Sequence, residues 1–209
     1  MTSSRDLAMK ALVVVSHPSP ESFNHALADV VRRTWASIGC DVSFHDLYLE
    51  RFEPLLTAEE ERGAPSSDPL VQAHIARLRE SDLLAVVHPN CWGAPPAMMK
   101  GWIDRVFAPE AAYTFAKGAD QGDVPIGLLK MRAALVLNTG NTVLEREQNH
   151  FGDPLDRIWR RCILNFCGVQ EVSRALFGVV ATSSPDQRAA WLQQAEVMAR
   201  DVHRVATRT

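Results

Sequence analysis

Short runs of apolar residues alternate along the chain with longer stretches of mixed apolar and polar residues. The three densest runs cover residues 10–16, 83–87 and 131–138, and they lack the polar alternation of a half-exposed strand. Such runs are typical of strands in a parallel sheet that is covered on both faces. Two weaker runs, at 41–47 and 172–180, predict two further strands, the first of them near a sheet edge.

The stretches between these runs carry the residue spacing of helices. Met99, Trp102, Ile103 and Val106, for example, recur at i, i+3, i+4 and i+7. The alternation of strands and helices predicts a parallel sheet with helices on both faces and right-handed crossovers. The other predicted helices run from a Ser19 N-cap and Pro20 to about Ile38, over 68–80, 154–167 and 185–207, with a short turn at 57–62.

A rigid loop follows the third apolar run. Pro89, Gly93, Pro95 and Pro96 exclude a regular element there, and Trp92 lies in the middle of the segment. Ligands of open α/β sheets bind at the carboxyl ends of strands, where this loop begins. Two interpretations stay open: Trp92 offers a platform to a flat ring, or it packs beneath the loop as part of the core.

The loop after the first strand, from His17 to Asn24, is rich in Ser and precedes a helix. Unpaired N–H groups and the helix dipole suit a helix N-terminus to an anion such as phosphate. On these local residues alone, an ordinary capped turn is the favoured alternative. No G-x-G-x-x-G motif follows the strand, so a Rossmann dinucleotide site is unsupported.

Two more connections hold candidate chemistry. Gly140 in the loop 139–142, after the fourth strand, allows a tight turn in which several N–H groups converge on one acceptor. The connection 108–130 is long for a single domain and carries Tyr113 and Phe115, which favours an interface role. Since the loops after strands one, three and four meet at one sheet edge, they predict a single elongated site for a flavin.

Composition narrows the class of protein. The chain has 209 residues, 46% of them hydrophobic, and a net charge of −3. This predicts one domain over 1–209 and gives no electrostatic sign of nucleic-acid binding or membrane insertion. The N-terminus lacks a signal-peptide core, which predicts a cytoplasmic protein. The four cysteines form no Cys-x-x-Cys pair and no metal-binding spacing with the histidines, so most are expected to be buried thiols; Cys162 falls at helical spacing between Ile158 and Phe166.

The segments together resemble the NAD(P)H:quinone oxidoreductases, the DT-diaphorase family. The likeness extends over nearly the whole chain as several ordered motifs at matching spacings. The matching motifs are Pro89 to Phe107 with Trp92, Lys100-Gly101-Trp102 and Arg105-Val106-Phe107, then Glu110 to Phe115, His17 with Ser22-Phe23-Asn24, Asp46-Leu47-Tyr48, Thr139-Gly140, and Phe166-Cys167-Gly168.

The resemblance implies a flavodoxin-like, doubly wound sheet of five parallel strands in the order 2-1-3-4-5. It implies FAD, or FMN as in smaller relatives, and a homodimer with shared active sites. Tyr113 and Phe115 then reach the partner's site and, with Trp92, contact the substrate; the alternative is simple packing against the helix that holds Trp102. The flavin-binding residues implied are His17, Ser22, Phe23, Asn24, Pro89, Asn90, Cys91, Trp92, Gly93, Thr139, Gly140, Asn141 and Thr142.

One segment departs from the family pattern. The relatives place a Tyr and a His before a Gly-Asp pair, whereas this chain has Phe151 before Gly152-Asp153 and no Tyr in that segment. His150 and Arg146 are the candidates for placing positive charge near a reduced flavin. The alternative, slightly favoured for His150, is a solvated loop histidine.

The activity implied is NAD(P)H dehydrogenation with hydride transfer to a quinone-like acceptor at one flavin face, by ping-pong kinetics. Azo- and nitro-reduction fit the same flat pocket. Two other classes stay open: a flavin-binding regulatory subunit of a transporter, and a one-electron carrier, against which the small net charge of −3 argues.

Overall fold

A five-stranded parallel sheet forms the centre of the computed structural model, which describes residues 8–116 and 124–208. Its order is β2-β1-β3-β6-β7, which is the predicted order 2-1-3-4-5, and the flavodoxin-like fold expected from the resemblance is confirmed. The interior strands are buried along almost their whole length because helices cover both faces, whereas β2 at the edge is half-exposed. The strands are β1 Lys10–Val15, β2 Asp41–Asp46, β3 Leu83–Pro89, β6 Ala133–Thr139 and β7 Glu171–Phe177.

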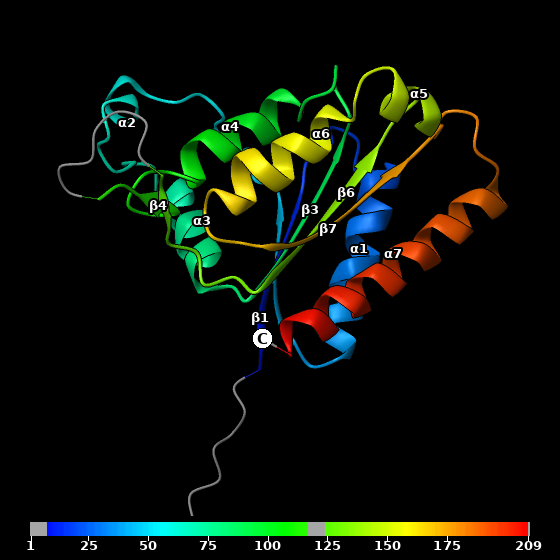
Figure 1. Ribbon diagram of the computed structural model, residues 1–209, viewed down its shortest axis with the longest axis horizontal. Helices are drawn as coiled ribbons and strands as arrows, with labels where there is room; N and C mark the ends of the chain where they lie inside the picture. Colours follow the sequence, from blue (N-terminus) through cyan, green and yellow to red (C-terminus); the bar gives the residue numbers. More distant parts are fainter. Residues whose placement is uncertain (1–7, 117–123, 209) are drawn as a thin grey trace, which may run out of the picture.

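Two layers of helices sandwich the sheet (Figure 1). Helices α1 (Phe23–Ser37) and α7 (Pro185–Ala206) pack on one face, where Val13 and Val15 of β1 meet Trp35. The opposite face packs Leu12 and Val14 against Trp102. The elements on that second side are α3 Pro69–Glu80, α4 Ala97–Val106, and α6 Pro154–Asp156, which continues into the π-helix η1 Arg157–Asn165.

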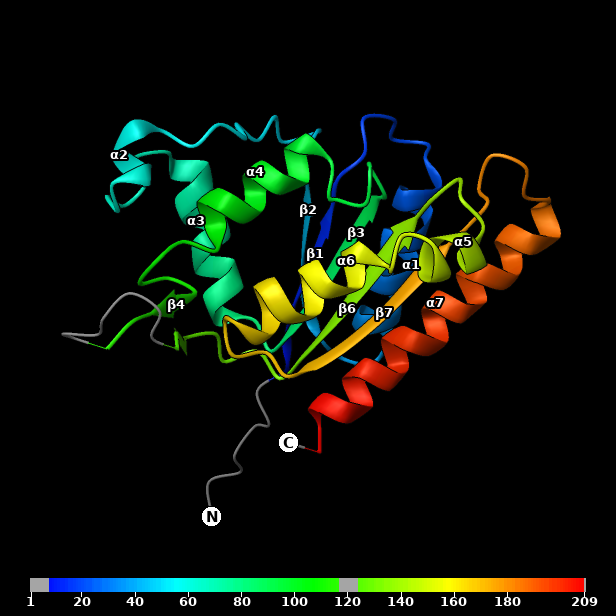
Figure 2. The same ribbon diagram turned by 45° about the horizontal axis from the view of Figure 1, so that its top comes forward.

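The remaining elements lie outside these layers. The short helices are α2 Ala58–Glu61 and α5 Leu144–Asn149, and β4 Tyr113–Thr114 pairs with β5 Ile126–Gly127 in an antiparallel hairpin. In both ribbon views the hairpin and α5 lie at opposite ends of the molecule (Figures 1 and 2). No helix among the described residues is long and apolar enough to cross a bilayer. The prediction that the N-terminus lacks a signal-peptide core rests partly on residues 1–7, which lie outside the described residues.

Helix α1 begins later than predicted. It starts at Phe23, and its N-cap is Ser22, whose Oγ accepts a hydrogen bond from the backbone N–H of His25. The predicted cap, Ser19, instead closes a turn in which its carbonyl accepts from the N–H of Ser22. The proline-based prediction was wrong because Pro20 sits inside this turn and not in the first turn of the helix.

The helix at 154–167 turns a different face inward from the one predicted. Its buried residues are Leu155, Trp159 and Leu164, whereas Cys162 is exposed. A π-helix has i→i+5 hydrogen bonds, so an inward stripe drawn at α-helical spacing fails there. Of the four cysteines, all described, Cys167 alone is buried, so the expectation that most are buried is also wrong.

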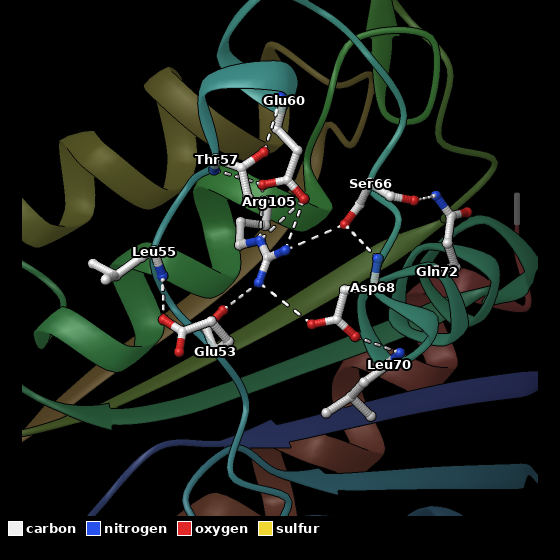
Figure 3. Close-up of polar contacts among 9 residues, drawn as sticks. All are labelled: Glu53, Leu55, Thr57, Glu60, Ser66, Asp68, Leu70, Gln72 and Arg105. Atoms are coloured by element: carbon white, nitrogen blue, oxygen red, sulfur yellow. Dashed lines mark hydrogen bonds and ion pairs between the residues drawn. The ribbon is translucent and has the colours of Figure 1, made fainter.

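A buried ion pair holds the irregular segment 53–68 onto α4 (Figure 3). The Arg105 guanidinium donates to Glu60 at 2.7 and 3.0 Å, to the Glu53 carbonyl at 2.6 Å and to Ser66 Oγ at 3.2 Å. The hydrogen bond from Arg105 lowers the pKa of Glu60 to about 2. Nearby, a Cβ on Gly101 would lie 2.2 Å from the Pro54 carbonyl oxygen, so the segment approaches the helix backbone directly.

A second, partly buried carboxylate cluster joins β2 to α3. Glu50 accepts hydrogen bonds from His45 at 2.7 Å and from His74 at 3.0 Å. Burial raises the pKa of Glu50, but the two hydrogen bonds outweigh burial and lower this pKa to about 2. The three side chains are also close enough to hold a metal ion. The Trp102 indole N–H, however, donates to His74 Nδ1 at 2.9 Å, which places the ring proton on Nε2. That nitrogen therefore donates to Glu50. We interpret the cluster as a hydrogen-bonded carboxylate.

Candidate functional site

A cleft of about 520 Å³ opens at the carboxyl edge of the sheet. It lies among the loops that follow β1, β3, β6 and β7, three of which are the blue, yellow-green and orange loops at the top of Figure 2. Distant segments thus meet as the sequence predicts. The lining residues are His17, Glu21, Ser22, Phe23, Asn24, Pro89, Asn90, Thr139, Gly140, Asn141, Thr142, Val180, Ala181 and Arg188.

The β1–α1 loop forms one end of the cleft and has the features of an anion site. Helix α1 leaves the N–H groups of Phe23 and Asn24 without intrahelical acceptors, as every helix does in its first turn. His17 is held by a hydrogen bond from the Ser19 N–H to its Nδ1 at 3.1 Å. The donors and the positive end of the helix dipole at this end fit a phosphate.

Arg188 adds a fixed positive charge to the cleft, and sequence reasoning missed it. Its Nε donates to Ser183 Oγ at 2.8 Å and its Nη2 to the Val180 carbonyl at 3.2 Å. The sequence pattern of α7 identified only the apolar positions that face inward, and Arg188 is not one of them. A usable signal existed, because Arg188 lies in the first turn of a helix that follows the fifth strand and so begins at the same sheet edge.

Two hydrogen bonds join the end of β6 to its neighbours, one to α1 and one to the end of β7. Asn24 is buried, and its Nδ2 donates to Thr139 Oγ1 at 3.0 Å. The N–H of Gly140 donates to the Phe177 carbonyl at 2.9 Å. A Cβ on Gly140 would make an ordinary 3.5 Å contact with Leu176, so the turn does not itself require glycine. The missing side chain instead leaves the cleft floor open beside Asn90, which suits a flat ring.

The Trp92 loop projects from the protein and its tip does not line the cleft. Trp92 is 104% exposed and has a φ of 58°, so the core interpretation is wrong. Cys91 and Gly93 lie with it in a tight turn. Asn90 anchors this turn: its Oδ1 accepts from the Gly93 N–H at 2.8 Å and its Nδ2 donates to the buried Glu147 at 2.8 Å. Pro89 and Asn90 line the cleft, and the three residues beyond them stand outside it.

A buried neutral histidine supports the end of β3. The Trp159 indole N–H donates to His88 Nε2 at 2.8 Å, so Nδ1 carries the proton and donates to the Pro89 carbonyl at 2.8 Å. Complete burial lowers the pKa of His88 to about 4, which keeps it uncharged at neutral pH. Sequence reasoning did not identify this pair, because nothing in the local pattern links positions 88 and 159.

His150 and Arg146 both lie on or beside α5 with exposed side chains, and neither lines the cleft. The Arg146 guanidinium lies 5.5 Å from the centre of the Phe151 ring, and the His150 ring packs edge-to-face on Phe151 at 5.3 Å. Within this chain, these contacts hold the two side chains away from the cleft lining.

Tyr113 and Phe115 form an aromatic cluster with Phe166. The Tyr113 ring lies 4.9 Å from Phe166 and 5.9 Å from Phe115, and Tyr113 also packs against the core cluster that contains Trp102 of α4. Neither residue lines the cleft of its own chain. In both ribbon views their hairpin lies at the opposite end of the molecule from α5 (Figures 1 and 2).

Comparison with known proteins now adds to this geometry. A family model described as the flavodoxin-like fold matches residues 9–201. The ribosyldihydronicotinamide dehydrogenase (quinone) of Mus musculus is 30% identical over 212 residues, covering 88% of this chain and 90% of the mouse protein.

Solved structures share the architecture. A crystal structure from Streptococcus mutans UA159 has a TM-score of 0.81 at 28% identity, covering 93% of this chain and all of that one. An FMN-dependent NADH-azoreductase from Bacillus anthracis, solved with FMN, has a TM-score of 0.66 at 15% identity, covering 92% and 98% of the two chains. The azoreductase likeness shows the fold alone.

Proposed function

The chain belongs to the flavodoxin-like fold family and, within it, to the NAD(P)H:quinone oxidoreductases, and we propose that it is a flavin-dependent NAD(P)H dehydrogenase that reduces quinones or similar flat acceptors. The observation that carries the proposal is the cleft, in which an anion-binding loop, a floor without a side chain at Gly140 and the end of β3 meet. A flavin has matching parts: phosphate at one end and a planar ring at the other.

Different residues of the cleft would hold the phosphates and the ring of such a cofactor. His17, Ser22 and Arg188 would hold the phosphates together with the first N–H groups of α1. Pro89, Asn90 and the loop 139–142 would hold the ring, with Trp92 covering it from the rim. When bound, the flavin supplies two-electron chemistry, taking hydride from NAD(P)H and giving it to the acceptor in ping-pong order.

FAD is the proposed form of the cofactor. Arg188 gives the phosphate end a cation on a second helix, beyond the α1 N-terminus, which suits two phosphate groups better than one. FMN stays the alternative, since an azoreductase of the same fold holds it. Quinones, azo dyes and nitro compounds all fit a flat acceptor site.

We also propose a homodimer with shared active sites. Tyr113 is half-buried and Phe115 is 50% exposed, and neither residue lines the cleft of the same chain. A role for these rings in substrate binding therefore needs a second copy. A single domain and a cytoplasmic location complete the proposal.

A transporter-regulating flavoprotein is the second candidate. The observation in its favour is that His150 and Arg146 stand exposed outside the cleft, so neither lies where a catalytic group would contact a bound ring. In that case flavin would bind without efficient turnover.

Anaerobic mixing with NADH or NADPH tests the proposed function. We expect the yellow flavin of the purified protein to bleach rapidly and to recover when a quinone is added. Binding of flavin without bleaching would favour the regulatory candidate. A colourless protein that takes up neither FAD nor FMN would contradict both.

Trp92→Ala tests the platform. Because the side chain is fully exposed, we expect the free energy of unfolding to stay within about 0.5 kcal/mol of wild type. Flavin retention or the bleaching rate should fall about tenfold, which equals about 1.4 kcal/mol. Trp92→Phe retains a ring and should keep most of the function; if both variants behave as wild type, Trp92 has no part in the site.

A further inference from the structure

Three side chains form a continuous hydrogen-bonded chain behind the anion-binding end of the cleft. Ser22 Oγ lies 2.8 Å from His25 Nδ1, and His25 Nε2 lies 2.9 Å from Asp46 Oδ2. The His25 and Asp46 side chains are only 15% and 10% exposed. Asp46 is itself held, because its other oxygen accepts the N–H groups of Tyr48 and Leu49 at 3.0 and 3.2 Å.

The direction of the His25–Asp46 hydrogen bond is fixed by chemistry, and that of the Ser22–His25 hydrogen bond depends on the charge of His25. An ionised carboxylate only accepts, so His25 Nε2 carries a proton and donates to Asp46. With neutral His25, Nδ1 is then an acceptor, and the Ser22 hydroxyl must donate to it. Ser22 Oγ already accepts the His25 backbone N–H at 3.3 Å as the helix cap. In this neutral state of His25, the one hydroxyl proton of Ser22 is engaged inside the protein and not directed into the cleft.

An anion needs the opposite arrangement. A phosphate oxygen cannot donate, so Ser22 can bind it only by turning its hydroxyl proton toward the cleft. His25 Nδ1 then loses its donor and can keep the 2.8 Å contact only by gaining a proton and donating to Ser22 Oγ, which has a second lone pair for it. The gained positive charge lies against the Asp46 carboxylate, which stabilises it.

We propose that His25 is a positioning residue that couples cofactor binding to the uptake of one proton, with Asp46 as its counter-charge. This rests on the proposed function, because the anion is the flavin pyrophosphate. No covalent bond changes: one proton moves from solvent to His25 Nδ1, and the Ser22 hydroxyl rotates from His25 to the phosphate. Binding should therefore weaken as the pH rises and His25 resists protonation.

Other titratable and charged groups lie around the hydrogen-bonded side chains Ser22, His25 and Asp46. They are the alternative sources of any proton uptake. The His17 ring packs edge-to-face on His25 at 6.4 Å and also lines the cleft, so it is the main rival for any proton uptake. The others on the neighbouring elements are Glu21, Asp29, which pairs with Arg32 and Arg33, and Arg188.

Calorimetric titration of the flavin-free, full-length protein with FAD tests the proposal. FAD is the right probe because its phosphates do not titrate near neutral pH, whereas a phosphate monoester such as that of FMN loses its second proton near pH 6. Titrations in two buffers of different ionisation enthalpy count the protons taken up. We expect net uptake of a proton on binding, up to one per FAD, and an affinity that falls as the pH rises.

Three variants assign the proton. In His25→Asn the side-chain amide can donate to Ser22 without titrating, so we expect FAD to bind with no proton uptake and little pH dependence. Ser22→Ala removes the hydroxyl and should also abolish uptake, with weaker binding. His17→Asn should retain the uptake even if affinity falls.

The outcomes separate this inference from the function on which it rests. A wild-type protein that binds no FAD at any pH contradicts the proposed function as well. FAD binding without proton uptake, or uptake that is lost in His17→Asn and kept in His25→Asn, overturns the coupling alone. Uptake that persists in Ser22→Ala would mean that His25 responds to the phosphate charge directly, and the Ser22 relay would be wrong.

Discussion

Replacing Arg188 with glutamate should weaken FAD binding by about a hundredfold or more. The wild-type guanidinium is held at the cleft by Ser183 and the Val180 carbonyl, so it is already oriented before any anion arrives. A charge-assisted hydrogen bond contributes about 1.5–3 kcal/mol, and a carboxylate in its place adds repulsion. The loss should be smaller for riboflavin, which has no phosphate.

The matched control for this variant is Arg200→Glu. Arg200 lies on the same helix three turns further on, where its exposed side chain pairs with Glu196 at 2.9 Å. We expect FAD affinity to be unchanged there, because the site is remote from the cleft. Isothermal titration or fluorescence quenching of FAD measures both variants. Equal affinities in Arg188→Glu and wild type would remove Arg188 from the site.

Arg105→Ala should destabilise the fold by about 3–5 kcal/mol. The change leaves Glu60 as an unpaired charge, with only 8% of its side chain exposed, and frees the Glu53 carbonyl and Ser66 hydroxyl that the guanidinium holds (Figure 3). Urea unfolding measures the loss. Arg200→Ala, which breaks an exposed i,i+4 pair, should cost only about 0.3–0.5 kcal/mol.

The pH dependence of this cost follows from Glu60. In the wild type its pKa is lowered to about 2, so the pair stabilises the folded state above the ordinary carboxyl pKa of about 4.3. That contribution is lost as the pH falls toward 2. The difference between Arg105→Ala and wild type should therefore shrink in acid. Arg105→Met combined with Glu60→Gln removes both charges and should recover part of the stability; a cost in Arg105→Ala as small as the Arg200 control would contradict the buried-pair account.

Local pattern was sufficient to predict the sheet, whereas the order of its strands was predicted from the family resemblance. The runs at 10–16, 83–87 and 131–138 are apolar on both sides of each strand, which only a sheet covered on two faces can accommodate. Because parallel strands place their following loops at one edge, the sequence also predicted which segments meet in the cleft, from His17 to Thr142. Local pattern misled where backbone geometry departed from the α-helix, as at the π-helix around Cys162 and the Ser22 cap.

Side-chain pairing, by contrast, was decided by the tertiary structure alone. Periodicity reports which face of an element is apolar, but it carries no information about which polar group on another element will meet it. Asp46 behind His25 and Trp159 against His88 are both of this kind, since each depends on how separate elements pack. The same holds for Trp92: the sequence placed it at the strand end, and only the packed fold determined that its ring points outward, because its turn is anchored from below by Asn90.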